Sequence, residues 1–206
     1  MKKTTVLIID DHAILRMGLS SLLNAKDDIE VVGDSPDGED GVAKARELRP
    51  DVAIVDLMMP GMDGAETTRR LLAEAPETKV LILTTFDTSD GITMALNAGA
   101  AGAIMKNCDF GDLVSAIHAI AKGGRYVSPE VERILSNDPP TVPLSPRQAE
   151  ILHLIVRGLS NPEIARLLGI GLDTVKEHVE TLFLKIGAAN RTEAVTIAMR
   201  KHLLKP

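Results

Sequence analysis

Five polar residues stand where short apolar segments of the chain end. Asp10 and Asp11 follow the first segment, Asp56 closes the third, Thr84 closes the fourth, and Lys106 comes at the end of the fifth. If these segments are parallel strands of one sheet, their carboxyl ends share an edge, where functional residues gather. The pattern therefore predicts a single polar pocket built from positions that are far apart in the sequence.

The predicted pocket combines three carboxylates with a lysine and a hydroxyl group. Carboxylates that are held close together repel one another, so a divalent cation is their natural neutralising partner. Mg²⁺ suits the set because it binds one or two carboxylates together with water and phosphate oxygens. The Lys106 ammonium and the Thr84 hydroxyl would contact a phosphate oxygen. The set predicts a site that accepts a phosphoryl group, with Asp56 as the nucleophile.

The elements that must position this pocket alternate along residues 4–122. Short segments rich in β-branched residues are separated by patterns with helical periodicity, which predicts an α/β doubly wound fold with a five-stranded, all-parallel sheet. The expected strands are Val6–Ile9, Ile29–Gly33, Val52–Val55, Val80–Leu83 and Gly102–Met105. The expected helices lie near 12–24, 38–48, 64–74, 88–98 and 109–122.

The end of the chain carries helical signals only. Ser145 and Ser160 are each followed three residues later by Gln148 or Glu163, which is typical of a capping box at a helix start. A short helix, a glycine-containing turn and a longer helix then predict a helix-turn-helix. The expected helices are 145–157, 161–168, 172–186 and 191–203, which gives domains at 1–122 and 144–206 joined by a Pro-rich linker at 123–143.

Composition excludes several classes of protein. The chain is 45% hydrophobic, yet no apolar segment has the roughly 18–20 residues that a membrane span needs. Cys108 is the single cysteine, so no internal disulfide forms and we expect a reducing, cytoplasmic location. Aromatic residues make up only 2% of the chain, which disfavours binding of single-stranded bases by stacking.

The net charge of -6 is divided unevenly along the chain. Residues 1–143 carry 14 basic and 23 acidic side chains, a net charge of −9, whereas residues 144–206 carry 9 and 6, a net charge of +3. This asymmetry indicates an acidic domain joined to one that could meet a polyanion. On charge alone, ordinary surface variation remains an equally good interpretation.

Both parts of the chain resemble known bacterial modules. The stretches LIIDDHAILRMGL, DVAIVDLMMPGMDG, LILTTF and AGAAGAIMKN resemble the receiver domain of response regulators. The stretch LSPRQAEILHLIVRGLSNPEIARLLGIGLDTVKEHVETLFLKIGAANRTEAV resembles a LuxR-type DNA-binding domain. Together they cover nearly the whole chain and resemble the NarL/FixJ type of two-component regulator.

The resemblance implies a role for each pocket residue. Asp56 would receive its phosphoryl group from a sensor histidine kinase, and Thr84 and Lys106 would contact that group. Asp11, the Asp56 carboxylate and the Met58 backbone carbonyl would hold Mg²⁺, with Asp10 contributing through water. Phosphorylation would then control dimerisation and the binding of double-stranded promoter DNA, with the last helix at the seam of the homodimer.

The expected recognition helix, 172–186, departs from what DNA binding favours. Lys176 and Lys185 are outnumbered by three acidic residues, so the helix carries −1 and gains little from phosphate neutralisation. Two interpretations stay open: Glu177 and Glu180 read cytosine N4 groups, or they weaken a binding that depends on dimerisation. The candidate phosphate contacts are Arg147, Arg166, Lys176, Lys185 and Arg191.

Other functions fit less well, and we expect no enzyme. A phosphatase of the haloacid dehalogenase type needs a second aspartate two residues after the first, where Met58 stands, and no G-x-G-x-x-G motif follows the first strand. Receivers usually carry an aromatic residue at the position of Ala103, so how this chain would switch is open. A partner-binding scaffold, or a phosphorylation-independent regulator with weak DNA affinity, remains the alternative.

Overall fold

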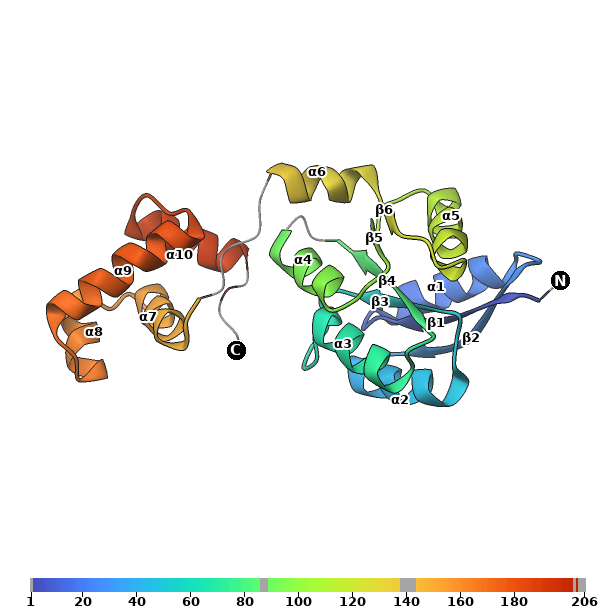
Figure 1. The fold of residues 1–206 in the computed structure, drawn as a ribbon, viewed down its shortest axis with the longest axis horizontal. Helices are drawn as coiled ribbons and strands as arrows, with labels where there is room; N and C mark the ends of the chain where they lie inside the picture. Colours follow the sequence, from blue (N-terminus) through green and yellow to red (C-terminus); the bar gives the residue numbers. More distant parts are fainter. Residues whose placement is uncertain (1, 86–88, 138–143, 202, 204–206) are drawn as a thin grey trace. The chain divides into compact units, whose positions relative to one another are not determined.

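The chain divides into two compact units, Met1–Asp138 and Pro139–Pro206, each with its own hydrophobic core. The computed structural model describes residues 2–85, 89–137, 144–201 and 203 (Figure 1). None of the helices within these ranges is long and apolar enough to cross a membrane.

The first unit is built on a parallel sheet with the strand order β2-β1-β3-β4-β5-β6. All five residues of β3 are buried, as expected for a central strand that is covered on both faces. The five predicted strands are confirmed to within two residues at their ends. The strands are β1 (Thr4–Ile9), β2 (Ile29–Ser35), β3 (Val52–Asp56), β4 (Lys79–Thr84), β5 (Gly102–Met105) and β6 (Tyr126–Val127).

Helices cover both faces of this sheet, which confirms the doubly wound architecture (Figure 1). Leu19 of α1 and Ile117 of α5 are buried with the residues of one face. Leu71 of α3, Ile92 of α4 and Val131 of α6 are buried with the other face, together with α2. The helices are α1 (Ala13–Asn24), α2 (Gly38–Leu48), α3 (Gly64–Glu74), α4 (Ser89–Asn97), α5 (Phe110–Ala121) and α6 (Pro129–Asn137).

The sheet has six strands, so the expectation of five is corrected. The backbone N–H groups of Tyr126 and Ser128 donate to the carbonyls of Ala101 and Ala103 at 3.1 and 3.0 Å, which adds β6 beside β5. A strand of two residues is too short to show alternation in the sequence, and it fell in the expected linker 123–143. Of that segment, 123–137 packs into the first unit, and 138–143 lie outside the described residues.

The second unit contains the four predicted helices. Ser145 accepts a hydrogen bond from the Gln148 backbone at 3.2 Å and donates its own N–H to the Gln148 side chain at 3.0 Å, as the capping-box pattern predicts. Apolar residues from all four helices form its core. The helices are α7 (Pro146–Val156), α8 (Asn161–Leu168), α9 (Leu172–Ile186) and α10 (Arg191–Arg200).

Gly64, at the start of α3, brings that helix against the end of β3. Its N–H donates to the Leu57 carbonyl at 2.9 Å. A Cβ atom there would lie 2.4 Å from the Asp56 carbonyl oxygen and 2.7 Å from the Leu57 Cα, both of which are backbone atoms. The chain can therefore turn this closely past the strand end only with glycine.

We expect Gly64→Ala to lower the free energy of unfolding of the first unit by about 1–3 kcal/mol, because the backbone around Asp56 must shift. Gly18→Ala in α1 is the matched control. A Cβ atom there meets nothing within 4 Å, so alanine should stabilise the helix by about 0.5–1 kcal/mol. Urea unfolding of both variants measures the difference, and equal effects would contradict the packing role of Gly64.

Candidate functional site

The predicted pocket residues come together at the carboxyl edge of the sheet. Asp10 follows β1, Asp56 and Thr84 are the last residues of β3 and β4, and Lys106 follows β5. The strand order reverses between β1 and β3, and in open α/β sheets ligands bind beyond such a switch point. The fold therefore places Asp10 and Asp56 on the two strands that flank the expected binding crevice.

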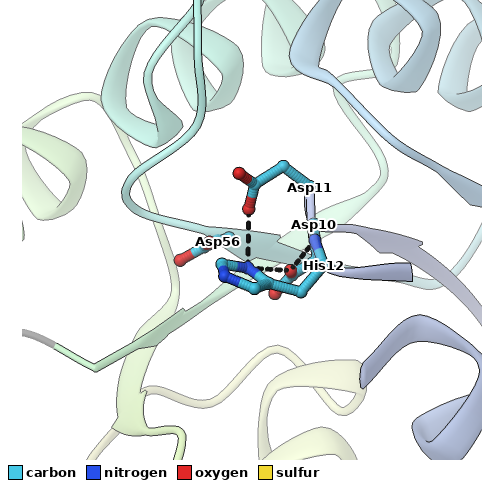
Figure 2. A group of neighbouring side chains, drawn as sticks. All are labelled: Asp10, Asp11, His12 and Asp56. Atoms are coloured by element: carbon cyan, nitrogen blue, oxygen red, sulfur yellow. Dashed lines mark hydrogen bonds and ion pairs between the residues drawn. The ribbon is translucent and has the colours of Figure 1, made fainter. Parts of the chain in front are cut away.

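Four side chains form an acidic cluster at this edge: Asp10, Asp11, His12 and Asp56. Each offers one ligand atom, and these atoms all lie within 4.8 Å of one another (Figure 2). Asp10 and Asp56 are only 1% and 3% exposed, whereas Asp11 is exposed to solvent. Buried and exposed carboxylate oxygens thus meet in one group, which is a donor set that fits a hard divalent cation.

Lys106 places an ammonium group between two of these carboxylates. Its Nζ lies 2.7 Å from Asp10 Oδ2 and 2.8 Å from Asp56 Oδ2, and its side chain is 8% exposed. The Lys106 N–H donates to the Thr84 carbonyl at 2.7 Å, which holds the end of β5 against β4. Thr84 itself is fully buried. A single buried cation therefore contacts both strands of the switch point.

The charges in the cluster are not balanced by Lys106. Burial raises the pKa of Asp56, and although the hydrogen bond and charge of Lys106 act to lower it, repulsion from Asp10 helps to keep it raised. Burial acts to lower the pKa of Lys106, but its contacts with Asp10 and Asp56 outweigh this and leave it raised. The three carboxylates thus outnumber the one lysine, and a divalent cation would offset the remaining negative charge.

His12 belongs to this cluster as well, although no ligand role was predicted for it from the sequence. Its side chain is 67% exposed, yet Nδ1 lies 2.7 Å from Asp11 Oδ1 and 3.2 Å from Asp10 Oδ1 (Figure 2). The signal was its position directly after the two aspartates. Met58 also lies in the pocket, where its N–H donates to Asp56 Oδ1 at 3.3 Å.

In the second unit, α8 and α9 form the helix-turn-helix. Gly169 ends α8 in the left-handed conformation, with φ +64°, and α9 begins three residues later. The core stripe of α9 faces the other helices of the unit: Val175, Val179, Leu182 and Ile186 are buried, and Phe183 is partly buried. The opposite face is exposed and carries Lys176, Glu177, Glu180 and Leu184.

Two of the candidate phosphate contacts bind backbone carbonyls inside the second unit. Arg147 donates to the Leu168 carbonyl at 3.2 Å and to Glu150 at 2.7 Å. Arg191 donates to the carbonyls of Leu159 and Ile155. These guanidinium groups join helices to one another, a use that the sequence pattern does not reveal.

The other three candidate cations differ in their surroundings. Lys185 donates to the Gln148 side chain at 2.9 Å, and Lys176 lies 2.8 Å from Asp173 on the same helix. Arg166 is exposed on α8. Lys185 and Lys176 therefore each contact a side chain of their own domain, and the proposed contacts of all five cations with DNA stay a prediction.

Two families match the chain, one on each unit. The family described as the response regulator receiver domain matches residues 6–118, and the luxR family of bacterial regulatory proteins matches residues 142–198. The chain is a response regulator. Its receiver domain carries the acidic cluster, and its LuxR-type DNA-binding domain carries the helix-turn-helix.

Relatives of this response regulator match it over nearly its full length. The transcriptional regulatory protein LiaR of Bacillus subtilis is 39% identical, covering 97% of this chain and 98% of that protein. The response regulator ChrA of a heme-sensing two-component system has a solved structure that is 39% identical, covers 99% of this chain and all of that chain, and has a TM-score of 0.61.

A DNA-bound structure is also similar to this response regulator. RcsB from Salmonella enterica serovar Typhimurium, bound to promoter P1flhDC in the presence of the phosphomimetic BeF3-, is 25% identical with a TM-score of 0.73. The match covers 98% of this chain and 100% of that chain. The alignment therefore includes the α9 region.

In this response regulator, Ala103 shares a core with residues of α6. Ala103 is fully buried and belongs to the same core as Val131, which is also fully buried. The Ser128 N–H donates to the Ala103 carbonyl at 3.0 Å, so α6 starts directly beside β5. The position where receivers usually place an aromatic side chain is thus packed against the chain's own next helix.

We expect Asp56→Asn to raise the unfolding temperature of the metal-free protein at neutral pH. The pKa of Asp56 is raised in the folded state, so ionisation of this group costs the folded state free energy. This free-energy cost is present above the pKa that Asp56 has in the folded protein. It is lost as the pH falls towards the pKa of an aspartate in the unfolded chain, about 3.9. The gain from asparagine should therefore shrink as the pH falls.

Thermal unfolding in the presence of EDTA, followed by circular dichroism, measures this gain at several pH values. Asp34→Asn is the control, because Asp34 is an exposed carboxylate paired with Arg16 outside the cluster. A gain for Asp56→Asn that grows as the pH falls would contradict the assigned burial cost.

Proposed function

We propose that this response regulator is a transcriptional regulator controlled by phosphorylation of Asp56. The phosphoryl group would come from the phosphohistidine of a sensor histidine kinase: a carboxylate oxygen of Asp56 bonds to phosphorus, and the phosphorus–nitrogen bond breaks. The observation that carries this proposal is the contact of Lys106 with both Asp10 and Asp56 in a buried pocket. Such a pocket holds the nucleophile, Asp56, next to a cation that would offset the negative charge of the incoming phosphoryl group.

The proposed roles of the other pocket residues follow from their chemistry. Asp10, Asp11, Asp56 and the Met58 backbone carbonyl would hold Mg²⁺, directly or through water. Bound Mg²⁺ would offset negative charge on the transferred group. Lys106 would contact a phosphoryl oxygen, since its ammonium already lies 2.8 Å from Asp56. The Thr84 hydroxyl, at the end of the neighbouring strand, would contact another.

We propose that the DNA-binding domain acts on double-stranded promoter DNA through α9. The exposed face of α9 follows a helix-turn-helix, and RcsB, which aligns with the chain, is bound to promoter DNA. In this proposal active molecules bind two half-sites as a homodimer with α10 at the seam. Phosphorylation would serve regulation and no separate catalytic activity, and the lone Cys108 supports a cytoplasmic location.

A second candidate is a regulator or scaffold that does not depend on phosphorylation. The specific observation in its favour is Ala103, which lacks the aromatic side chain that receivers usually use when they switch, and which is packed under α6. Phosphorylation and its effect on DNA binding therefore need separate tests.

We expect the protein to take up one phosphoryl group from acetyl phosphate when Mg²⁺ is present, as measured by intact-protein mass spectrometry. EDTA and Asp56→Asn should each abolish labelling, because the first removes the metal and the second removes the nucleophile. Asp28→Asn is the control, since Asp28 precedes β2, away from the carboxyl edge, and pairs with His118. Labelling of Asp56→Asn equal to wild type would overturn the assignment.

Phosphorylation should increase the affinity for a duplex that the protein selects from random DNA, because dimers contact two half-sites at once. Fluorescence anisotropy with phosphorylated wild type and unphosphorylated Asp56→Asn measures the difference, which we expect to be about tenfold or more. Equal affinities would favour the phosphorylation-independent regulator. Absence of binding to any duplex would favour the scaffold.

A further inference from the structure

The exposed face of α9 presents carboxylates where a DNA-binding helix would meet DNA. Glu177, Glu180 and Leu184 follow one another at spacings of three and four, so they lie on one stripe of the helix. Leu184 is 82% exposed, and both glutamates are exposed. This stripe lies opposite the buried stripe that includes Val175 and Leu182.

The carboxylates of Glu177 and Glu180 differ from the neighbouring polar groups of α9, which make hydrogen bonds or ion pairs within the domain. Among the described residues, neither the Glu177 nor the Glu180 carboxylate makes a hydrogen bond or an ion pair. Lys176 is paired with Asp173 at 2.8 Å. The Thr181 hydroxyl donates a hydrogen bond to the Glu177 carbonyl at 2.9 Å and accepts one from the Gln148 side chain at 3.2 Å.

A carboxylate can meet DNA favourably in few places. It carries acceptors only, so it is repelled by phosphates and by the acceptors that guanine and thymine present in the major groove. Adenine presents an N6 amino donor, but its N7 acceptor lies next to that donor. Cytosine presents the N4 amino group with no acceptor on its own major-groove edge, which makes cytosine the base that suits a carboxylate best.

We propose that Glu177 and Glu180 are specificity residues that accept hydrogen bonds from the N4 amino groups of cytosines in each half-site. This inference rests on the proposed binding of DNA through α9. A carboxylate that faces any other base edge is left desolvated and unpaired, which costs binding free energy. The glutamates therefore lower the affinity for most duplexes, but not for the duplexes that place cytosine opposite them.

The test is selection of binding sites from random duplexes by the full chain after treatment with acetyl phosphate. Wild type should select half-sites with cytosine at defined positions. Glu177→Gln and Glu180→Gln should each change one of these positions from cytosine to adenine, because glutamine pairs with adenine N6 and N7. Measured on single-base variants of the selected duplex, the preference for cytosine should fall by about tenfold.

Glu150→Gln is the matched control. Glu150 is an exposed glutamate of α7 that pairs with Arg147, so the change removes the same charge from the domain without touching α9. It should leave the selected sequence unchanged. Circular dichroism of Glu177→Gln and Glu180→Gln should match wild type, because both positions are exposed on the surface of α9.

Two results would overturn the inference. If both α9 variants bind all duplexes more tightly and select the wild-type sequence, the carboxylates act by repulsion alone, and the proposed DNA-binding function still stands. If wild type, phosphorylated or not, binds no duplex, the proposed function fails and the inference fails with it.

Discussion

The receiver domain depends on one electrostatic constraint: three carboxylates converge on the edge of a sheet where a single buried ammonium opposes them. Lys106 contacts Asp10 and Asp56 at 2.7 and 2.8 Å, yet the pKa of Asp56 remains raised because burial outweighs what one lysine supplies. The strand order brings the carboxylates together, and Gly64 keeps the next helix close against the strand end that carries Asp56. The fold therefore keeps these carboxylates close to Lys106, and a further cation or a phosphoryl group bound there would change the contacts among them.

The DNA-binding domain uses some of its positive charges to stabilise its own fold. Arg147 and Arg191 donate from their guanidinium groups to backbone carbonyls at the end of α8, near the end of α7 and in the segment that follows α7, so these cations stabilise the domain itself. The carboxylates of Glu177 and Glu180 stand on the exposed face of α9 without such tasks. The net charge of the domain is thus an incomplete guide to its affinity for DNA, because part of the positive charge is committed to the fold.

Much of the receiver fold could be predicted because its strands are buried on both faces and appear as short apolar segments, each ending in a polar residue. The meeting of Asp56 and Lys106 at one edge of the sheet was predicted in this way. The sequence did not reveal β6, since two residues show no periodicity, or the contacts of Arg191, since an arginine that binds a carbonyl looks like any surface cation. The contact of His12 with Asp11, at 2.7 Å, could not be predicted because it depends on how the chain turns after β1.

The pairing of β6 with β5 also bears on how response regulators can be recombined. Because Val131 is fully buried in the same core as Ala103, the receiver ends structurally with α6, well past the last helix of the repeating strand–helix pattern. A chimaera joined at residue 122 would leave β5 as an open edge and replace the residues that cover Ala103. A junction after residue 137 would carry the sheet's last strand and α6 along with the acidic cluster, so the natural unit of exchange is longer than the strand–helix repeat.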